Sequence, residues 1–308
     1  MPLLPNLIKE NAALAVCEGK YELKMKVRII TSIVALAFII PFFVFADVTT
    51  PTDPLNYLFP LLFSLIAFIS VWEMLHCLKQ DKNYVISVPL YLAALVFPML
   101  ARILHDDMLL LVKLGIVTAL AIGVYMFISI VFHFGKIPSS TIGLVFMTCF
   151  YIIGANTAIV VLRNTPVTGK FLVLIPFLLS WTTDIFAYFT GRFFGKHKLI
   201  EAVSPKKTVE GAIGGLVFCS LVAILYGVIV GHFFDVTLHL IILPVGGIFM
   251  GIVSQLGDLV MSAIKREQGI KDYGFILPGH GGLLDRFDSS MAVTVAVLVI
   301  TLFNPIFG

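Results

Sequence analysis

The sequence predicts an all-α polytopic membrane protein with about nine transmembrane helices. Of its 308 residues, 59% are hydrophobic and only 13% are charged, whereas soluble domains are roughly 45–50% apolar. The apolar residues form runs close to the roughly 20 residues that a helix needs to cross a bilayer. Strands of an outer-membrane barrel would instead alternate over about ten residues, so we expect the spans to be helical.

Nine apolar runs are candidates for these helices. They lie near residues 27–46, 57–78, 84–103, 108–133, 141–162, 171–193, 210–230, 238–262 and 289–304. We divide the chain into a cytoplasmic leader able to form a surface amphipathic helix, a scaffold of five spans and a C-terminal region of four spans, at residues 1–26, 27–170 and 171–308. We assign Glu73, His76 and His133 to the scaffold, because they fall near helix ends where their side chains can reach water.

The basic residues are distributed unequally between the two sides of the predicted membrane region. With a cytoplasmic N-terminus, the cytoplasmic segments hold all of the 21 lysines and arginines except Arg102, Lys113, Arg163 and Lys170. The positive-inside rule therefore predicts an integral inner-membrane protein with its N-terminus in the cytoplasm and its C-terminus outside. The net charge of +3 is too small and too dispersed to suggest a nucleic-acid partner.

Asp184 is a carboxylate inside the predicted sixth span, about 13 Å from its cytoplasmic end at the helical rise of about 1.5 Å per residue. A charge at that depth is costly and usually faces a bundle interior or a wet cavity, where it serves a function. Spacings of four and eight residues place Tyr188 and Arg192 on the same helical face. We therefore expect a polar, cytoplasm-facing active-site cleft in the C-terminal half of the chain.

The loop after this span is rich in basic residues, from Arg192 to Lys207. Near its end, Ser204 or Thr208 can cap a new helix. The first N–H groups of that helix, together with Lys206 and Lys207, would bind an anion, and phosphate is the natural ligand.

A polar stripe ends the eighth span and leads into a glycine-rich turn. Steps of three, four and three residues place Gln255, Asp258, Ser262 and Lys265 along one helical face. The basic residues, turn residues and carboxylates that follow are Arg266, Lys271, His280, Gly281, Gly282, Asp285, Arg286 and Asp288. The histidine can either lock the turn by a hydrogen bond or contact a phosphate.

Carboxylates among lysines and arginines at the water end of helices are suited to hold Mg²⁺ against phosphate oxygens. Magnesium prefers one or two carboxylates together with waters and substrate phosphates. The sequence contains neither a Walker A loop nor a Rossmann glycine pattern. A nucleotide must therefore be held by another arrangement of residues.

Residues 262–288 resemble the signature of the phosphatidate cytidylyltransferase family, whose members are also called CDP-diacylglycerol synthases. The positions that carry the resemblance are Ser262, Lys265, Arg266, Lys271, Asp272, Gly274, Pro278, His280, Gly281, Gly282, Asp285, Arg286 and Asp288. Similar positions upstream are Asp184, Ala187, Tyr188, Gly191, the segment 204–208, Glu210 and Gly211. The resemblance is close over residues 180–290, whereas the first 170 residues match only in hydropathy.

The resemblance implies that CTP and phosphatidate react to give CDP-diacylglycerol and pyrophosphate, the committed activation step of phospholipid synthesis. It implies catalytic roles for Asp258, Asp285, Lys265, Arg266, Arg286 and Asp184. The CTP or phosphatidate phosphates are expected to contact Ser204, Lys206, Lys207, Thr208, Ser262, Lys271, His280, Gly281 and Gly282. Mg²⁺, with a second cation left open, is expected on Asp258 and Asp285, and further candidate ligands are Asp288 and Asp184.

Two other functions fit part of the sequence. A CTP-dependent lipid-alcohol kinase would use similar phosphate and metal groups but transfer the γ-phosphoryl group, and the full signature through Asp288 argues against it. A secondary transporter would use Asp184 and Asp258 as ion or proton sites, which does not account for the basic loops. A homodimer also stays open, because small residues of the seventh span can pack against a helix of a second subunit or, as we favour, of the same chain; they are Gly211, Gly214 and Gly215.

Overall fold

A computed structural model describes residues 54–234, 242–276 and 281–303. Within these residues, eight helices are long and apolar enough to cross a membrane. They match the last eight of the nine predicted spans, so the all-α membrane fold is confirmed. The leader at 1–26 and the first predicted span at 27–46 lie outside the described residues.

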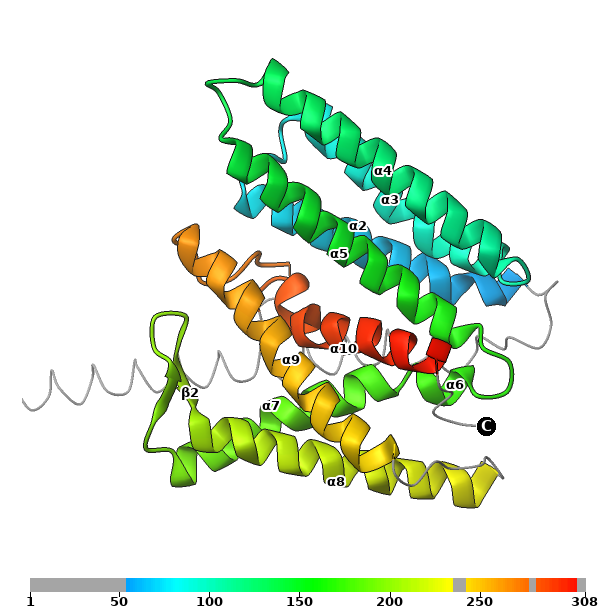
Figure 1. Cartoon of the computed structure of the whole chain (residues 1–308), viewed down its shortest axis with the longest axis vertical. Coiled ribbons are helices and arrows are strands. Elements are labelled where there is room, and N and C mark those ends of the chain that lie inside the picture. Colours follow the sequence, from blue (N-terminus) through cyan, green and yellow to red (C-terminus); the bar gives the residue numbers. More distant parts are fainter. Residues whose placement is uncertain (1–53, 235–241, 277–280, 304–308) are drawn as a thin grey trace, which may run out of the picture.

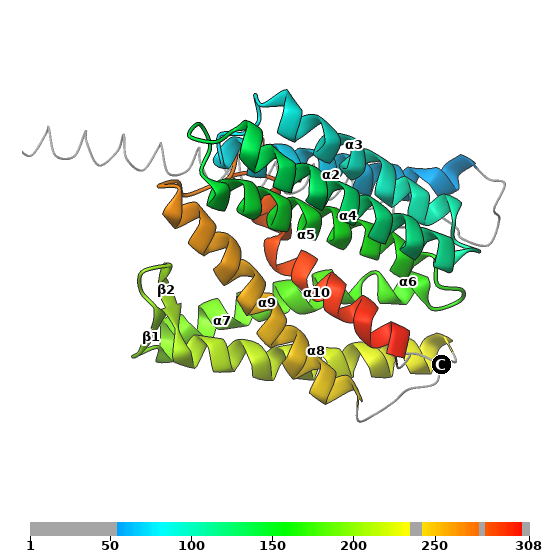
Figure 2. The same ribbon diagram turned by 45° about the horizontal axis from the view of Figure 1, so that its top comes forward.

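The helices form two groups with α10 between them. The elements in chain order are η1 (Pro54–Tyr57), α2 (Leu58–Cys77), α3 (Tyr84–Ile103), α4 (Met108–Phe132), α5 (Ser139–Arg163), α6 (Gly169–Leu172), α7 (Ile175–Phe194), β1 (Lys198–Ile200), β2 (Ser204–Thr208), α8 (Val209–Phe234), α9 (Ile242–Glu267) and α10 (Leu284–Phe303). Helices α2 to α5 lie side by side in one group, and α7 to α9 form the other, as Figures 1 and 2 show. Helix α10 contacts α5 on one side and α7 and α9 on the other.

Two details of this arrangement differ from the sequence prediction. A small antiparallel sheet stands in the basic loop, where Lys198 pairs with Thr208 and Ile200 with Ser204. Helix α10 begins at Leu284 rather than near residue 289. A hydropathy criterion misses its first turn because that turn is charged, yet a carboxylate such as Asp285 is favourable at a helix N-terminus.

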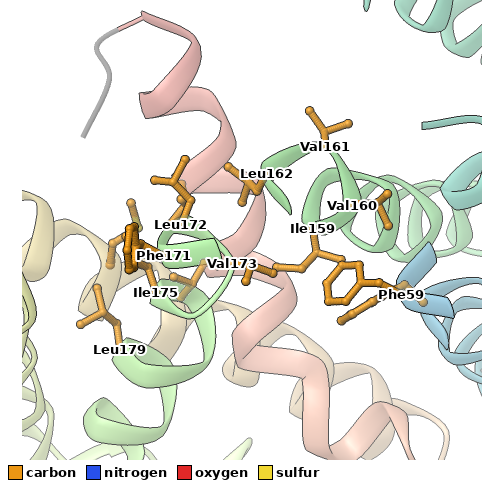
Figure 3. Packing of buried hydrophobic residues seen from close by; sticks show 14 of the residues in the cluster. Phe59, Ile159, Val160, Val161, Leu162, Phe171, Leu172, Val173, Ile175 and Leu179 are labelled. Atoms are coloured by element: carbon orange, nitrogen blue, oxygen red, sulfur yellow. The ribbon is translucent and has the colours of Figure 1, made fainter. Parts of the chain in front are cut away.

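Buried apolar side chains join the two groups where α2, α5, α6 and α7 meet. Figure 3 shows Phe59 of α2 against Ile159 of α5, with Phe171 and Ile175 on the α6–α7 side. All four are nearly inaccessible to solvent. Because lipid is as apolar as these side chains, close packing rather than exclusion of water holds the helices together.

The connections α2–α3, α4–α5, α7–α8 and α9–α10 all lie at one end of the bundle, at the left in Figure 1. We call this the basic end, because its connections carry most of the lysines, among them Lys79, Lys136 and Lys207. The α3–α4 connection, at the opposite end, carries Asp106 and Asp107 instead. The charge asymmetry predicted from the sequence therefore exists in the folded chain.

Helices α7 and α8 approach each other closely through glycines. A Cβ atom built on Gly211 would lie 2.6 Å from the Ala187 carbonyl oxygen and 3.1 Å from the Gly191 Cα. A Cβ on Gly215 would lie 2.9 Å from the Thr183 carbonyl oxygen. The small residues of this span therefore serve packing within the chain, as favoured above.

We expect Gly211→Ala to lower the free energy of unfolding by about 1–3 kcal/mol, because overpacking a tight contact forces the backbones apart. The change should appear as a lower melting temperature of the purified protein in detergent. Gly246→Ala in α9 is the matched control, since a Cβ there meets nothing within 4 Å. Equal melting temperatures of the two variants would contradict this account of the α7–α8 contact.

Candidate active site

A polar cleft of about 330 Å³ lies between α7, the β-hairpin, α8 and α9, at the basic end of the bundle. Its lining residues are Asp184, Ala187, Tyr188, Gly191, Arg192, Leu199, Lys206, Lys207, Thr208, Gly211, Ala212, Gln255 and Asp258. Asp184, Tyr188 and Arg192 share the cleft, and the Arg192 Nη1 donates a hydrogen bond to the Tyr188 hydroxyl at 3.0 Å. The predicted common face of this helix is therefore confirmed.

Asp258 of α9 and Lys207 of β2 form an ion pair across this cleft. The Ser262 hydroxyl, one turn further along α9, donates a hydrogen bond to Asp258 Oδ1 at 3.2 Å. The side chains of Lys207 and Asp258 are each 24% exposed and line the cleft, although the Lys207 Nζ atom itself is covered. A strand and a helix from separate parts of the sequence thus place a cation and a carboxylate against each other.

Asp184 connects α7 to the start of α10. The Ser289 hydroxyl donates a hydrogen bond to Asp184 Oδ2 at 3.3 Å, and the Ser289 backbone N–H donates to Asp288 Oδ1 at 2.7 Å. Asp288 is only 7% exposed and does not line the cleft. Of the predicted metal ligands, Asp184 and Asp258 therefore line the cleft, whereas Asp288 does not.

Asp285 belongs to a second polar network, with Lys265. The Lys265 Nζ donates a hydrogen bond to Asp285 Oδ1 at 2.7 Å, and Asp285 Oδ2 accepts from the backbone N–H groups of Tyr273 and Gly282 at 2.8 and 3.0 Å. The two side chains are 9% and 3% exposed. Asp285 thus links α9, the α9–α10 connection and α10, and it does not line the cleft that Asp258 borders. Its role as a metal ligand stays a prediction.

Tyr273 also belongs to this second network. Its hydroxyl donates a hydrogen bond to the Met261 carbonyl oxygen at 2.9 Å, and the Lys265 Nζ lies 5.1 Å from the centre of its ring. Burial raises the pKa of the Tyr273 phenol above its ordinary value, so the phenol remains a hydrogen-bond donor at neutral pH.

The hairpin side of the cleft is fixed by hydrogen bonds to the backbone. The Thr208 hydroxyl accepts from the Gly211 N–H at 3.1 Å and so caps α8, as predicted, while Ser204 lies in β2 and does not cap the helix. The Arg266 Nε donates to the Val203 carbonyl oxygen at 3.3 Å and its Nη1 to the Ile270 carbonyl oxygen at 3.0 Å. This arginine therefore ties the hairpin to the end of α9.

The remaining predicted residues lie around the α9–α10 connection. Lys271 and Arg286 are exposed, and Gly281 adopts a φ of 89°, a conformation that favours glycine. Gly282 offers its N–H to Asp285. His280 lies outside the described residues.

Glu73 is a residue whose environment the sequence analysis predicted wrongly. Its side chain does not reach water, because it is 0% exposed and accepts hydrogen bonds from the backbone N–H groups of Leu283 and Leu284 at 2.9 and 2.7 Å. His76, one turn later, is exposed as predicted; its hydrogen bond holds the pKa of Asp81 below the usual value. No local pattern could reveal the partners of Glu73, since they lie 210 and 211 residues further along the chain.

The cleft offers too few carboxylates to bind Mg²⁺ by itself, but enough to bind it together with a substrate phosphate. Among the described residues, no group of three or more His, Cys, Asp or Glu side chains is arranged to hold a metal ion. Magnesium commonly uses one or two carboxylates and takes its other oxygens from water and substrate phosphates. Asp184 and Asp258, which border the same cleft, meet that requirement.

Comparison with known proteins gives this cleft a chemical context. Residues 26–303 match the cytidylyltransferase family. The chain belongs to this cytidylyltransferase family. It is therefore a nucleotidyltransferase enzyme and, given its eight described spans, an integral membrane protein.

Several curated relatives of this cytidylyltransferase carry the name phosphatidate cytidylyltransferase. Those of Staphylococcus haemolyticus and Staphylococcus saprophyticus are 35% and 36% identical over 281 residues, which cover 87% of this chain and 96% of each relative. That of Staphylococcus aureus (strain COL) is 50% identical over 128 residues, covering 41% of this chain and 46% of the relative. The family match begins at residue 26, so the similarity includes residues 26–170, where the sequence alone indicated only matching hydropathy.

Proposed function

We propose that this cytidylyltransferase acts on phosphatidate, joining it to the cytidylyl group of CTP to give CDP-diacylglycerol and pyrophosphate. The names of relatives that match along nearly their whole length support this substrate. The observation that carries the proposal is the polar cleft, where Asp184 and Asp258 stand among Arg192, Lys206 and Lys207. Such a site suits two phosphate-bearing reactants rather than ion transport alone.

In this reaction a phosphate oxygen of phosphatidate attacks the α-phosphorus of CTP. A new phosphorus–oxygen bond forms, the bond from the α-phosphorus to the oxygen bridging to the β-phosphate breaks, and pyrophosphate leaves. The phosphate monoester already carries a nucleophilic oxygen near neutral pH, so no general base is required. Because both reactants are anionic, the main task of the chain is to position them and to neutralise their charge.

The basic residues of the cleft can perform this task. Arg192 and Lys206 are exposed at its mouth, and Lys207 is partly exposed beside Asp258. Guanidinium groups bind phosphate through paired hydrogen bonds, whereas lysine acts as a point charge. We infer that Lys207 leaves Asp258 for the triphosphate when CTP binds.

We further propose that Mg²⁺ is the cofactor and that Asp258 and Asp184 are its protein ligands. When bound, Mg²⁺ would neutralise charge on the phosphate oxygens. Asp285 and Asp288, the other ligands expected from the sequence, do not line the cleft: Asp285 pairs with Lys265, and Asp288 is buried. A second cation and a homodimer remain predictions that this proposal does not require.

The membrane orientation follows from the positions of the lysines. We propose that the basic end faces the cytoplasm, with the N-terminus on that side and the C-terminus outside, according to the positive-inside rule. CTP would then enter the cleft from water. Ile185 and Phe189, which flank the cleft residues on α7, are exposed and provide a lipid-facing surface from which phosphatidate can approach.

The test is turnover of CTP and phosphatidate by the purified protein in detergent with Mg²⁺. We expect CDP-diacylglycerol and pyrophosphate in equal amounts, and no turnover after the divalent cation is removed with EDTA. A protein that instead converted a lipid alcohol and CTP into a lipid phosphate and CDP would be a kinase. If the protein did not turn over CTP but took up a solute in a way that depended on Asp184 and Asp258, it would be a secondary transporter.

A further inference from the structure

Glu73 is a fully buried carboxylate that reaches from the N-terminal helix group to the beginning of α10. Its two oxygens each accept one backbone hydrogen bond, Oε1 from Leu283 at 2.9 Å and Oε2 from Leu284 at 2.7 Å. The preceding N–H, that of Gly282, donates to Asp285 Oδ2 at 3.0 Å. Three successive N–H groups are thus divided between two carboxylates, one from each half of the chain.

The glycines of the α9–α10 connection leave space for Glu73. A Cβ atom on Gly282 would lie 2.7 Å from Glu73 Oε1, and a Cβ on Gly274 would lie even closer to the same oxygen. Neither glycine has a left-handed backbone, so space rather than conformation requires glycine at these two positions. The approach of the carboxylate explains both residues.

The charge of Glu73 is balanced by the backbone. Within the part of the chain that the structure describes, no lysine, arginine or histidine forms an ion pair with it. Its position at the first N–H groups of α10 places it in the favourable end of the helix dipole. Burying a carboxylate is costly unless hydrogen bonds replace its water, so this contact must fix the two segments firmly relative to each other.

We propose that Glu73 is a positioning residue for the cytidylyl transfer: it sets the place of the start of α10 and hence of Asp285 with its partner Lys265, and of Ser289, whose hydroxyl donates to Asp184 in the cleft. It touches neither the cleft nor any group that would react. Its effect passes through the Gly282–Leu284 backbone to Asp285, which accepts from Lys265 and Tyr273. This role rests on the proposed function, because its kinetic test measures CDP-diacylglycerol formation. A second test, by hydrogen–deuterium exchange, does not depend on that function.

The first experiment compares Glu73→Gln with the wild type. Glutamine keeps the size of the side chain but offers one acceptor oxygen for two N–H donors, so one buried N–H loses its partner. We expect kcat to fall about 10- to 100-fold, the range for residues that orient ligating groups, with a much smaller change in the KM for CTP. His76→Gln on the same helix is the control with unchanged kcat, because His76 is exposed and its side-chain hydrogen bond goes to Asp81, away from the α9–α10 connection.

Hydrogen–deuterium exchange supplies a readout that needs no substrate. In Glu73→Gln, peptides containing Tyr273 or Gly282 should exchange faster, while peptides of α4 keep their protection. The proposal would be overturned if Glu73→Gln only lowered the melting temperature. In that case kcat at low temperature and the exchange of these peptides would equal those of the wild type, and Glu73 would have a purely structural role. A wild type inactive toward phosphatidate would instead overturn the proposed function, and the exchange test would still decide the role of Glu73.

A second pair of variants keeps the proposal testable if Glu73→Gln does not fold. Gly282→Ala should lower kcat in the wild-type background, because its methyl group meets the Glu73 carboxylate. In a Glu73→Asp background the shorter side chain makes room, so adding Gly282→Ala should cost less than it does alone. If the fold-loss in kcat of the double variant equalled the product of the two single losses, Gly282 and Glu73 would act independently, contrary to the proposal.

Discussion

Asp258→Asn is expected to lower kcat about 10²–10³-fold, the range seen when one preorganised electrostatic group is removed from an active site. Asp258 faces the cleft, accepts a hydrogen bond from Ser262 and pairs with Lys207. Asparagine keeps the shape but removes the charge that would hold Mg²⁺ and orient Lys207. The measurement is CDP-diacylglycerol formation by purified protein at saturating CTP and phosphatidate.

The control for this variant is Asp106→Asn, at the opposite end of the bundle. The Asp106 side chain is 91% exposed and pairs with its neighbour His105, so the loss of its charge should leave kcat unchanged. Both variants should retain the wild-type melting temperature within a few degrees, since Asp258 lies in a partly exposed pair. An Asp258→Asn enzyme with near wild-type kcat would remove Asp258 from the active site.

The largest effect on stability is expected from Lys265→Met. Lys265 and Asp285 are 9% and 3% exposed, and removing one partner of a buried ion pair leaves an uncompensated charge that costs about 3–5 kcal/mol. We expect this loss in the free energy of unfolding measured in mixed detergent micelles. Activity should fall as well, because Asp285 also holds the backbone N–H groups of Tyr273 and Gly282.

An exposed pair provides the comparison. Asp81→Asn removes the charge from the contact between His76 and Asp81, whose side chains are 53% and 17% exposed, and pairs near the surface are worth about 0–1 kcal/mol. If Lys265→Met unfolded no more easily than Asp81→Asn, the Lys265–Asp285 pair would not be the structural tie that the geometry indicates.

Hydropathy was sufficient to predict the eight described spans because each of these helices is a long apolar run. The same criterion placed the start of α10 too late, since Asp285 and Asp288 interrupt the apolar run although they belong to the helix. It also gave no sign of the β-hairpin, whose strands Lys198–Ile200 and Ser204–Thr208 are short and polar.

Helical spacing predicted which side chains share a face of one helix, as for Asp184 and Arg192 on α7. It could not predict which helices meet. The packing brings Lys207 to Asp258 and Lys265 to Asp285, and the spacing of the residues gave no sign of either pairing. That Asp258 and Asp285 share a metal ion stays a prediction. The contact of Glu73 with the start of α10 was likewise invisible, because it depends on the packing of two distant segments.

If CTP reacts in the cleft between α7, the hairpin and α9, bound CTP should shield a thiol placed on the cleft wall. Leu199→Cys, combined with Cys17→Ala, places a single accessible thiol on the cleft wall, because Cys77, Cys149 and Cys219 are buried. We predict that CTP with Mg²⁺ slows modification by a membrane-impermeant thiol reagent and that the modified protein no longer forms CDP-diacylglycerol. Labelling that is unaffected by saturating CTP, in a protein that stays active after modification, would place the reaction elsewhere.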